Sequence, residues 1–250
     1  MIKLQNLNEF LTKYMRLDEC DPKDDGFVNG LQIEGKEDIQ RIAFAVDACV
    51  DTILRAKEAN CDALIVHHGV GYGGIKSITG FEKPRIKAAL IHDVSLFCYH
   101  LSLDKHPEIG NNIQLCKILG IKHAVPFTDV GYAGELEFHE SLESFSQKVK
   151  QKLDTNLTVL PFGPKDIKRV AIISGKPGAS RISEAAEQGY DVILVGEAGH
   201  DTYHVAKESN LNVIAGGHYA TETVGVQALA NVIKQEFNIE VGFIDSPTGL

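Results

Sequence analysis

The stretch CDALIVHHGVGYGG, residues 61–74, decides how the rest of the sequence is interpreted. Its apolar part is typical of a strand buried on both faces of a sheet, yet it ends in His67 and His68 and then in a series of glycines. Adjacent side chains of a strand point to opposite faces, so both histidines can reach one site only where the strand ends and the backbone turns. The glycines from Gly69 onward permit such a turn. The simpler alternative is one buried, hydrogen-bonded histidine beside one exposed histidine.

Strands and helices alternate around this stretch. The sequence predicts strands over 41–47, 61–68 and 94–100, with helices over 48–60, 83–93 and 107–120. Continuously apolar strands that alternate with helices are typical of a parallel sheet covered on both faces. The predicted fold class is therefore α/β. In sheets of this class, ligands bind outside the carboxyl ends of the strands, which is where the two histidines are expected.

A second strand–helix–strand unit resembles the first. Residues 41–66 and 169–195 both begin with an arginine and aliphatic residues, and both enter the second strand through an aspartate, Asp62 or Asp191. Any two such units share this composition, so these segments alone do not distinguish a repeat from chance. The next predicted strand in each half favours a repeat. It ends in a histidine that an acidic residue follows four positions later: His100 with Asp104, and His218 with Glu222.

We therefore predict two related lobes, each a mostly parallel sheet flanked by helices. The first lobe, residues 1–126, carries the histidine pair. The second lobe, residues 127–250, carries the HxxxE motif of His218 and Glu222. The C-terminal segment is a candidate to pack back on the first lobe.

Composition and charge argue against several classes of protein. The 250 residues carry a formal net charge of −9, whereas a general nucleic-acid binder neutralises phosphates with clustered Lys and Arg. No apolar run approaches the ~20 residues that span a bilayer, and the opening residues lack the apolar stretch of a signal peptide. We therefore expect a cytoplasmic protein without a membrane segment. The cysteines lack CxxC spacing, which indicates reduced thiols: Cys20, Cys49, Cys61, Cys98 and Cys116.

The histidines and carboxylates at the predicted strand ends suit a first-row transition metal, and nitrogen and oxygen ligands are compatible with Zn, Fe, Mn, Co or Ni. A histidine and an acid four positions apart share one helix face and can converge on one ion, although this spacing is also frequent by chance. The candidate ligands exceed what one four-coordinate zinc needs: His67, His68, Asp104, His218 and Glu222. They can instead hold two ions about 3.5–4 Å apart, a pair that generates hydroxide near neutral pH.

Three segments carry a resemblance to a known family: LIVHHG (64–69), YHLSLDKHPEIGNN (99–112) and AGGHYATETVGVQAL (215–229). In this order and spacing, and with NGLQIEG (29–35), they resemble the Nif-three-like family, the GTP cyclohydrolase I type 2 homologues, in its short bacterial and archaeal form. The resemblance covers nearly the whole chain. It implies a two-lobed α/β protomer with two divalent metal ions and a ring-shaped homohexamer. It places the metal ligands at the five residues given above.

The resemblance also implies a metal-dependent hydrolase that acts on a small-molecule nucleotide or phosphoester, by opening the ring of GTP or by cleaving a phosphoester. The family pattern includes Gly-Glu and a later histidine, here Glu197 and His204, which are placed near the metals as supporting or substrate-contacting residues. His100 or His204 is the candidate proton shuttle, because imidazole titrates near neutral pH. The segment GVGYGGIKS (69–77) departs from many relatives, which leaves the substrate preference open. The alternative function is a non-catalytic metal-binding scaffold or a regulatory partner protein.

Overall fold

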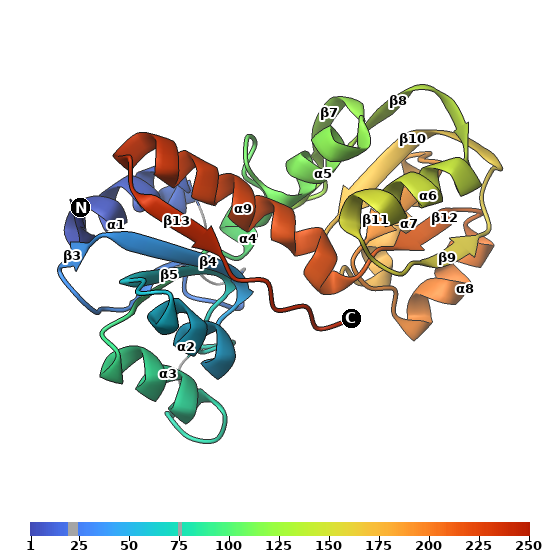
Figure 1. Ribbon diagram of the computed structural model, residues 1–250. Coiled ribbons are helices and arrows are strands. Elements are labelled where there is room, and N and C mark those ends of the chain that lie inside the picture. The colour runs from blue at the N-terminus through green and yellow to red at the C-terminus, as the bar shows by residue number, and fades with distance from the viewer. Residues whose placement is uncertain (20–24, 75–76) are drawn as a thin grey trace. The chain divides into compact units, whose positions relative to one another are not determined.

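The computed structural model describes residues 1–19, 25–74 and 77–250, and it divides into two compact units (Figure 1). Unit 1 comprises Met1–Leu103 and Val226–Ser246, and unit 2 comprises Asp104–Gly225 and Pro247–Leu250. In each unit a sheet is flanked by helices, which confirms the predicted α/β class. The boundary expected between residues 126 and 127 lies within β7 (Lys122–Phe127), a strand of the unit 2 sheet.

The main sheet described in unit 1 has the strand order β13-β4-β5-β6-β2. Its strands are β2 (Gly30–Ile33), β4 (Arg41–Asp47), β5 (Ala63–His68), β6 (Ser95–Cys98) and β13 (Glu240–Phe243). β13, β4, β5 and β6 run parallel, and β2 adds an antiparallel edge. Because β13 pairs with β4, the C-terminal part of the chain completes this sheet. A small separate sheet joins β1 (Ile2–Lys3) to β3 (Asp38–Ile39).

The helices of unit 1 include two that connect it to unit 2. They are α1 (Leu4–Tyr14), the 3-10 helix η1 (Leu17–Glu19), α2 (Val50–Glu58), α3 (Glu82–Ile91), α4 (Leu101–Asp104) and α9 (His218–Phe237). α4 ends at the first residue of unit 2, and α9 begins in unit 2 and continues into unit 1. α2 begins where Cys49 and Thr52 form a reciprocal capping box, which satisfies backbone N–H groups that the first turn leaves without helical partners.

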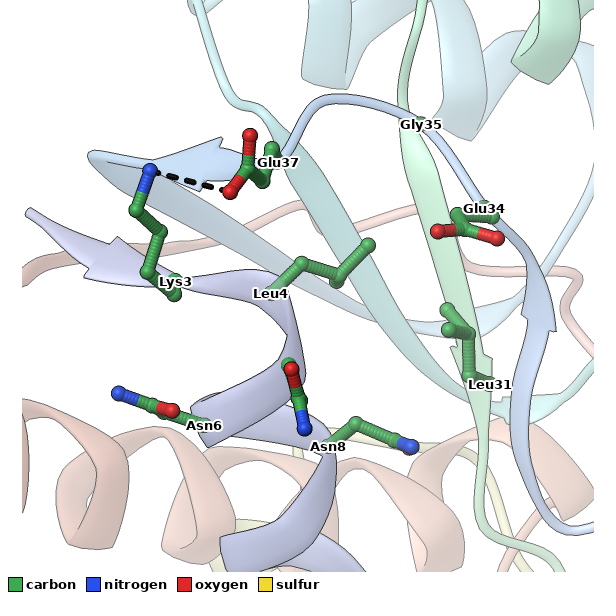
Figure 2. A pocket seen from close by; sticks show the side chains of 9 residues that line it. Lys3, Leu4, Asn6, Asn8, Leu31, Glu34, Gly35 and Glu37 are labelled. Carbon is green, nitrogen blue, oxygen red and sulfur yellow. Dashed lines mark ion pairs between the residues drawn. The ribbon is translucent and has the colours of Figure 1, made fainter.

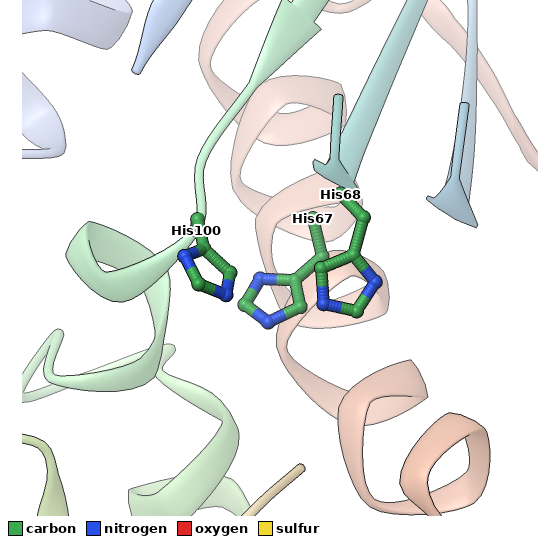
Figure 3. Close-up of side chains that lie close together, drawn as sticks. All are labelled: His67, His68 and His100. Atoms are coloured by element: carbon green, nitrogen blue, oxygen red, sulfur yellow. The ribbon is translucent and has the colours of Figure 1, made fainter. Parts of the chain in front are cut away.

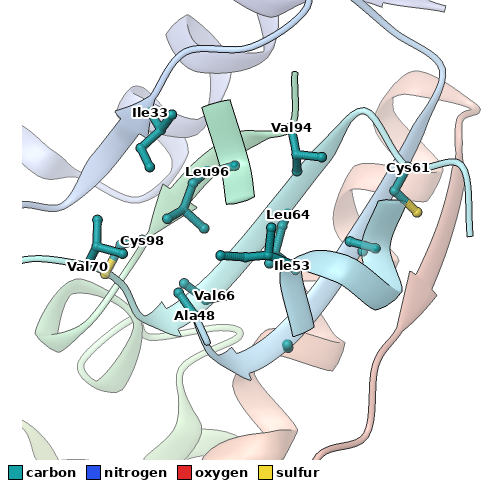
Figure 4. Packing of buried hydrophobic residues seen from close by; sticks show 14 of the residues in the cluster. Ile33, Ala48, Ile53, Cys61, Leu64, Val66, Val70, Val94, Leu96 and Cys98 are labelled. Atoms are coloured by element: carbon teal, nitrogen blue, oxygen red, sulfur yellow. The ribbon is translucent and has the colours of Figure 1, made fainter. Parts of the chain in front are cut away.

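Alternate side chains of strand β5 enter the apolar core that α2 and α3 cover. Leu64 and Val66 of β5 lie in one apolar cluster with Ile53 of α2 (Figure 4). Ala63 and Ile65 are equally buried but do not belong to this cluster. β5 is therefore buried along both faces, as its continuous apolar run predicts. The histidines that follow are the first polar side chains at the carboxyl end of this strand.

The sheet described in unit 2 has the strand order β7-β8-β10-β11-β12-β9. In addition to β7, its strands are β8 (Gly131–Ser141), β9 (Thr158–Pro161), β10 (Asp166–Ile173), β11 (Val192–Val195) and β12 (Asn212–Ala215). β10, β11 and β12 are parallel, and antiparallel strands flank them on both sides. The helices are α5 (Asn111–Leu119), α6 (Leu142–Leu153), α7 (Ala179–Glu187) and α8 (His200–Glu208). Alternate residues of β11 enter two separate apolar clusters, so this strand is also buried on both faces.

The two units repeat one arrangement of hydrogen bonds around the predicted pair of aspartates. The Asp62 Oδ2 atom accepts the backbone N–H groups of Gln40 and Arg41 at the start of β4. The Asp191 Oδ2 atom likewise accepts the N–H groups of Lys168 and Arg169 in β10. Each arginine also donates through its guanidinium to a backbone carbonyl just after the next helix. The repeat inferred from the sequence is therefore present in the structure.

The strand pairing corrects one detail of that repeat. The N–H of Tyr99 donates to the Val66 carbonyl, and the N–H of Gly216 donates to the Val195 carbonyl in the same place of the ladder. His100 therefore corresponds to Gly217, and His218 lies one position further along the chain. The two histidine–acid pairs are offset by one residue, a shift that composition alone does not reveal.

Two expectations about the chain as a whole can also be compared with the described residues. Within these residues, no helix is both long enough and apolar enough to cross a membrane. Cys49, Cys61, Cys98 and Cys116 are free thiols, as expected, and Cys20 lies outside the described residues.

Candidate metal centre

His67 and His68 end β5, and their rings lie together even though they are neighbours on a strand. The ring centroids are 4.6 Å apart. His67 is fully buried, whereas His68 is partly exposed. The alternation of a strand stops where β5 ends at His68, and this allows both rings to reach one place. The two histidines therefore do differ in burial, as the simpler alternative expects. Their rings nevertheless lie together, which that alternative does not explain.

His100 joins the pair from the neighbouring strand end. β5 and β6 are parallel and adjacent, so their carboxyl ends meet at the same edge of the sheet. The His100 ring centroid lies 5.0 Å from that of His67 and 5.4 Å from that of His68. One nitrogen from each ring lies within 4.8 Å of the other two, a spacing that can hold a metal ion (Figure 3). We call these three residues the histidine cluster.

Each ring of the histidine cluster is oriented by a hydrogen bond at Nδ1. The His67 Nδ1 atom lies 2.9 Å from the Tyr99 carbonyl oxygen. The bonds of the other two rings are to carboxylates: His68 Nδ1 to Asp47 Oδ1 at 2.9 Å, and His100 Nδ1 to Asp25 Oδ1 at 2.6 Å. A carbonyl oxygen can only accept, so Nδ1 of His67 carries the proton, and Nε2 is the nitrogen that could bind a metal. Histidines that ligate metals are usually held in this way.

Asp25 is a buried part of this arrangement. Its carboxylate also accepts the N–H groups of Phe27 and Leu101 and the Asn29 amide. Burial alone raises the pKa of Asp25, but the hydrogen bonds from His100 and Asn29 outweigh it and lower the pKa to about 2. An ionised carboxylate is therefore fixed behind His100.

Gly69 has a steric role rather than a conformational one. A Cβ atom at this position would lie 2.7 Å from the Cys98 Cβ and would overlap the Gln32 side chain. Gln32 crosses here because its Oε1 atom accepts the Val70 N–H and its Nε2 atom donates to the Val70 carbonyl. The glycine after the histidine pair thus allows the chain to pass close to β6.

Unit 2 carries its own donors at the start of α9. His218 and Glu222 lie one turn apart, and the His218 Nε2 atom is 3.2 Å from the Glu222 Oε2 atom. The His218 Nδ1 atom is 2.7 Å from Glu197 Oε1, just after β11. Lys176 pairs with the other oxygen of Glu197 at 3.2 Å. In unit 2, therefore, a histidine lies between two carboxylates.

The charges of this group shift the pKa values of its members. The hydrogen bond to Glu222, and then that to Glu197, raises the pKa of His218 to about 9 despite the opposing effect of burial. Burial alone raises the pKa of Glu197, but hydrogen bonds from His218 and Lys176 lower it. A metal binds only the neutral imidazole, so an ion that binds His218 must displace a proton.

Asp104 is buried at the end of α4, and its carboxylate is fixed by neighbouring side chains. Its Oδ1 atom accepts the Asn111 amide at 2.9 Å and the Ser174 hydroxyl at 3.0 Å. Ser174 follows β10, so a second strand end of unit 2 supports this carboxylate. A buried carboxylate with fixed orientation is suited to metal ligation.

His204 differs from the other predicted site residues. It lies on the exposed face of α8, beside Tyr203 and His200, with ring centroids 5.4 and 6.3 Å away. Among the described residues, it belongs to no group spaced to hold a metal. Its role as a proton shuttle stays a prediction.

A pocket of about 480 Å³ lies elsewhere in unit 1, at the start of α1 (Figure 2). It is lined mainly by exposed polar side chains, including those of Gln5, Asn6 and Glu34. Lys3 pairs with Glu37 at 3.2 Å on its rim. The pocket contains no member of the histidine cluster, so we assign the chemistry to the strand ends instead.

The sequence did not identify two carboxylates that orient the histidine cluster. Asp47 ends β4, so the rule that ligands bind at carboxyl strand ends was sufficient to find it. Asp25 lies outside the described helices and strands, in a stretch of sequence with several acidic residues, and no periodicity distinguishes it from its neighbours.

Comparisons with known proteins agree with these observations. A family model described as Duf34/NIF3 (NGG1p interacting factor 3) matches residues 2–249. A protein of Pyrococcus abyssi named GTP cyclohydrolase 1 type 2 homolog is 43% identical over 252 residues, covering 98% of this chain and 99% of its own. One of the same name from Pyrococcus horikoshii is 45% identical over 228 residues, covering 89% and 90%. The solved structure of TTHA1606 from Thermus thermophilus is similar with a TM-score of 0.91, 32% identity and full coverage of both chains.

Proposed function

This chain belongs to the Duf34/NIF3 (NGG1p interacting factor 3) family, as its motifs predict, and from that premise we propose that it is a metal-dependent hydrolase. The proposed centre holds two divalent ions per subunit. The proposed substrate is a small-molecule nucleotide or phosphoester, with GTP the first candidate because relatives are named after a GTP cyclohydrolase.

The observation that carries this proposal is the histidine cluster of unit 1. Three imidazoles converge at adjacent strand ends, and each is held at Nδ1 by a carbonyl or a carboxylate. Structural histidines need no such convergence, whereas metal ligands need both a shared target and a fixed tautomer. Nitrogen donors of this kind suit Zn, Fe, Mn, Co or Ni.

In the proposed site two rings of the histidine cluster are ligands, and the third, His100, is the proton shuttle beside them. The ligands are the residues predicted from the sequence: His67, His68, Asp104, His218 and Glu222. Bound divalent ions supply a water of lowered pKa and positive charge against the oxygen atoms of the substrate. Asp25 holds Nδ1 of His100, so Nε2 is the atom through which His100 accepts or delivers a proton. Glu197 holds Nδ1 of His218 and keeps that ring oriented toward Glu222.

The metal content of the protein tests the first part of the proposal. Elemental analysis of protein purified without added metal should find about two ions per chain, in line with a two-metal site. His67→Ala should lower this number, and the exposed His139→Ala, a matched control on β8, should not. No bound ion, even after reconstitution with each of the five metals, would remove the basis for the hydrolase.

Turnover tests the second part. The metal-loaded protein should convert GTP or a generic phosphodiester, and Glu222→Ala should abolish this conversion together with part of the metal content. If the protein holds its metals but converts neither substrate, the non-catalytic scaffold or regulatory partner is the better account. His139→Ala again controls for loss of an unrelated histidine.

A ring-shaped homohexamer in the cytoplasm completes the proposal, and it rests on the family resemblance. Light scattering coupled to size-exclusion chromatography should then give six times the chain mass of 27.3 kDa. A monomeric mass at working concentrations would exclude the hexamer while leaving the metal proposal intact.

A further inference from the structure

Tyr72 is a large aromatic side chain that the fold holds in an exposed position. It lies on the glycine-rich loop after β5 and is 73% exposed. Single exposed apolar residues are common and need no explanation by themselves. Tyr72 differs because its surroundings fix it in place.

The loop that carries Tyr72 is bound to the segment around Gly26. The Gly73 N–H donates to the Gly26 carbonyl at 2.7 Å. The Tyr72 ring lies directly against Gly26, where any Cβ atom would overlap the ring. Gly71 and Gly73 have φ values of 75° and 74°, a conformation that glycine adopts without strain. The exposed ring is therefore held on a defined support.

Phe27 connects Tyr72 to the histidine cluster. The Phe27 ring centroid lies 5.1 Å from that of Tyr72, in an edge-to-face arrangement. The Phe27 ring centroid also lies 5.1 Å from that of His100 and 5.9 Å from that of His68. Phe27 also packs against the core beneath α2 and α3, which anchors it. Phe27 and Tyr72 thus form a continuous aromatic surface that starts at the histidine cluster.

We propose that Tyr72, supported by Phe27, is the stacking surface for the planar base of a nucleotide whose phosphate groups lie at the histidine cluster. Of the two proposed reactions this arrangement fits phosphoester cleavage, because in ring opening the base itself reacts. This inference rests on the proposed function and narrows its substrate to base-bearing molecules. Stacking on an aromatic ring requires only a flat π-face, which a purine has and a simple phosphodiester lacks. Tyr72 is then a specificity residue rather than a catalytic residue.

Binding of GTP and of inorganic triphosphate to the metal-loaded protein tests this inference. The two probes share their phosphates, so the ratio of their dissociation constants isolates the contribution of the nucleoside. We expect the wild-type protein to bind GTP roughly tenfold or more tightly than triphosphate, as one stacked base provides. Tyr72→Ala should remove most of this preference, and Tyr72→Phe should retain it. Triphosphate binding should stay the same in all three proteins.

Two controls keep the result interpretable. Phe138→Ala removes a comparably exposed aromatic ring from β8 in unit 2, and it should leave the preference unchanged. Thermal denaturation checks that the Tyr72 variants remain folded. Binding does not depend on turnover, so failure of the hydrolase proposal and failure of this one are separable. Equal affinity for the two probes, no GTP binding, or a preference that survives Tyr72→Ala would each overturn the inference.

Discussion

The two units share one strand–helix–strand frame, but the residues at the carboxyl ends of its strands differ. Counted from the shared aspartates, unit 1 places His67 and His68 where unit 2 places Gly196 and Glu197. Unit 1 therefore presents a cluster of imidazoles. Unit 2 presents carboxylates around a single histidine that comes from the following helix.

The residues behind these donors differ as well. In unit 1, Asp47 ends β4 and holds His68. The corresponding residue in unit 2 is Gly175, and a Cβ atom there would overlap the Glu222 carboxylate. One frame therefore yields two kinds of donor set. A strand end either carries an acid that orients a neighbouring histidine, or it leaves room for an acid from a helix.

Gly196→Ala should have the largest effect of the variants considered. Position 196 corresponds to His67 in unit 1, but unit 2 has no room for a side chain there. A Cβ atom here would lie 2.8 Å from the Thr221 hydroxyl and closer still to the Gly175 carbonyl oxygen. Backbone must shift to admit it, so we expect a loss of about 3 kcal/mol in the free energy of unfolding, measured by chemical denaturation. Gly242→Ala is the matched control, since a Cβ atom there meets nothing within 4 Å. Equal stability of the two variants would contradict the tight packing of unit 2.

Asp47→Asn tests whether the orienting acid of unit 1 supports metal binding. The amide bonds Nδ1 of His68 less strongly than the carboxylate does, so we expect metal affinity to fall by about 10–100-fold. Competition with a chelating dye measures this change. Asp51→Asn, at an exposed site where Asp51 pairs with Arg55, controls for loss of a nearby charge. Unchanged affinity would mean that Asp47 has only a structural role.

The stability of the metal-free protein should respond to pH in opposite directions in the two units. The pKa of His218 is raised from 6.5 to about 9, so its contribution is complete below pH 6.5 and is lost as pH rises to 9. The pKa of Asp25 is lowered from 3.8 to about 2, so its contribution is present above pH 3.8 and is lost as pH falls toward 2. Urea denaturation after chelation of metals measures the free energy of unfolding at each pH. It should fall at high pH, the alkaline limb of the curve, and at low pH, the acid limb.

Single variants separate the two limbs. Glu222→Gln removes the largest cause of the His218 shift and should flatten the alkaline limb only. Asp25→Asn should flatten the acid limb only. If either variant changed both limbs equally, the two donor sets would not titrate independently.

Local patterns predict most of the frame and of the donor set. The apolar runs of β4, β5 and β6 identify buried parallel strands, and the rule that ligands bind at their carboxyl ends selects His67, His68 and His100. The histidine–acid pairs predicted the repeat, and the equivalent backbone hydrogen bonds of Asp62 and Asp191 in the two units support it.

Other features depend on contacts that no local pattern encodes. The C-terminal segment is a predicted neighbour of the first lobe, but a short apolar segment does not specify that β13 pairs with β4. Asp25 orients His100 from a loop without periodicity. The one-residue offset of His218 arises because two glycines replace Tyr99 and His100 at the end of β12, and only the hydrogen-bond ladder shows this.

The smallest expected effect concerns the aspartates that the two units share. Asp62 and Asp191 accept equivalent backbone N–H groups, but Asp62 also pairs with Lys36 at 2.7 Å. Burial alone raises the pKa of Asp62, and the hydrogen bonds from Lys36 and then Gln40 outweigh it and lower the pKa. Since Lys36 is about half exposed, Asp62→Asn should destabilise by only about 1 kcal/mol or less beyond Asp191→Asn. A Lys36→Gln background should abolish this difference in chemical denaturation. If the difference persists without Lys36, the two aspartates differ in their backbone contacts, and the frames are less alike than their hydrogen bonds indicate.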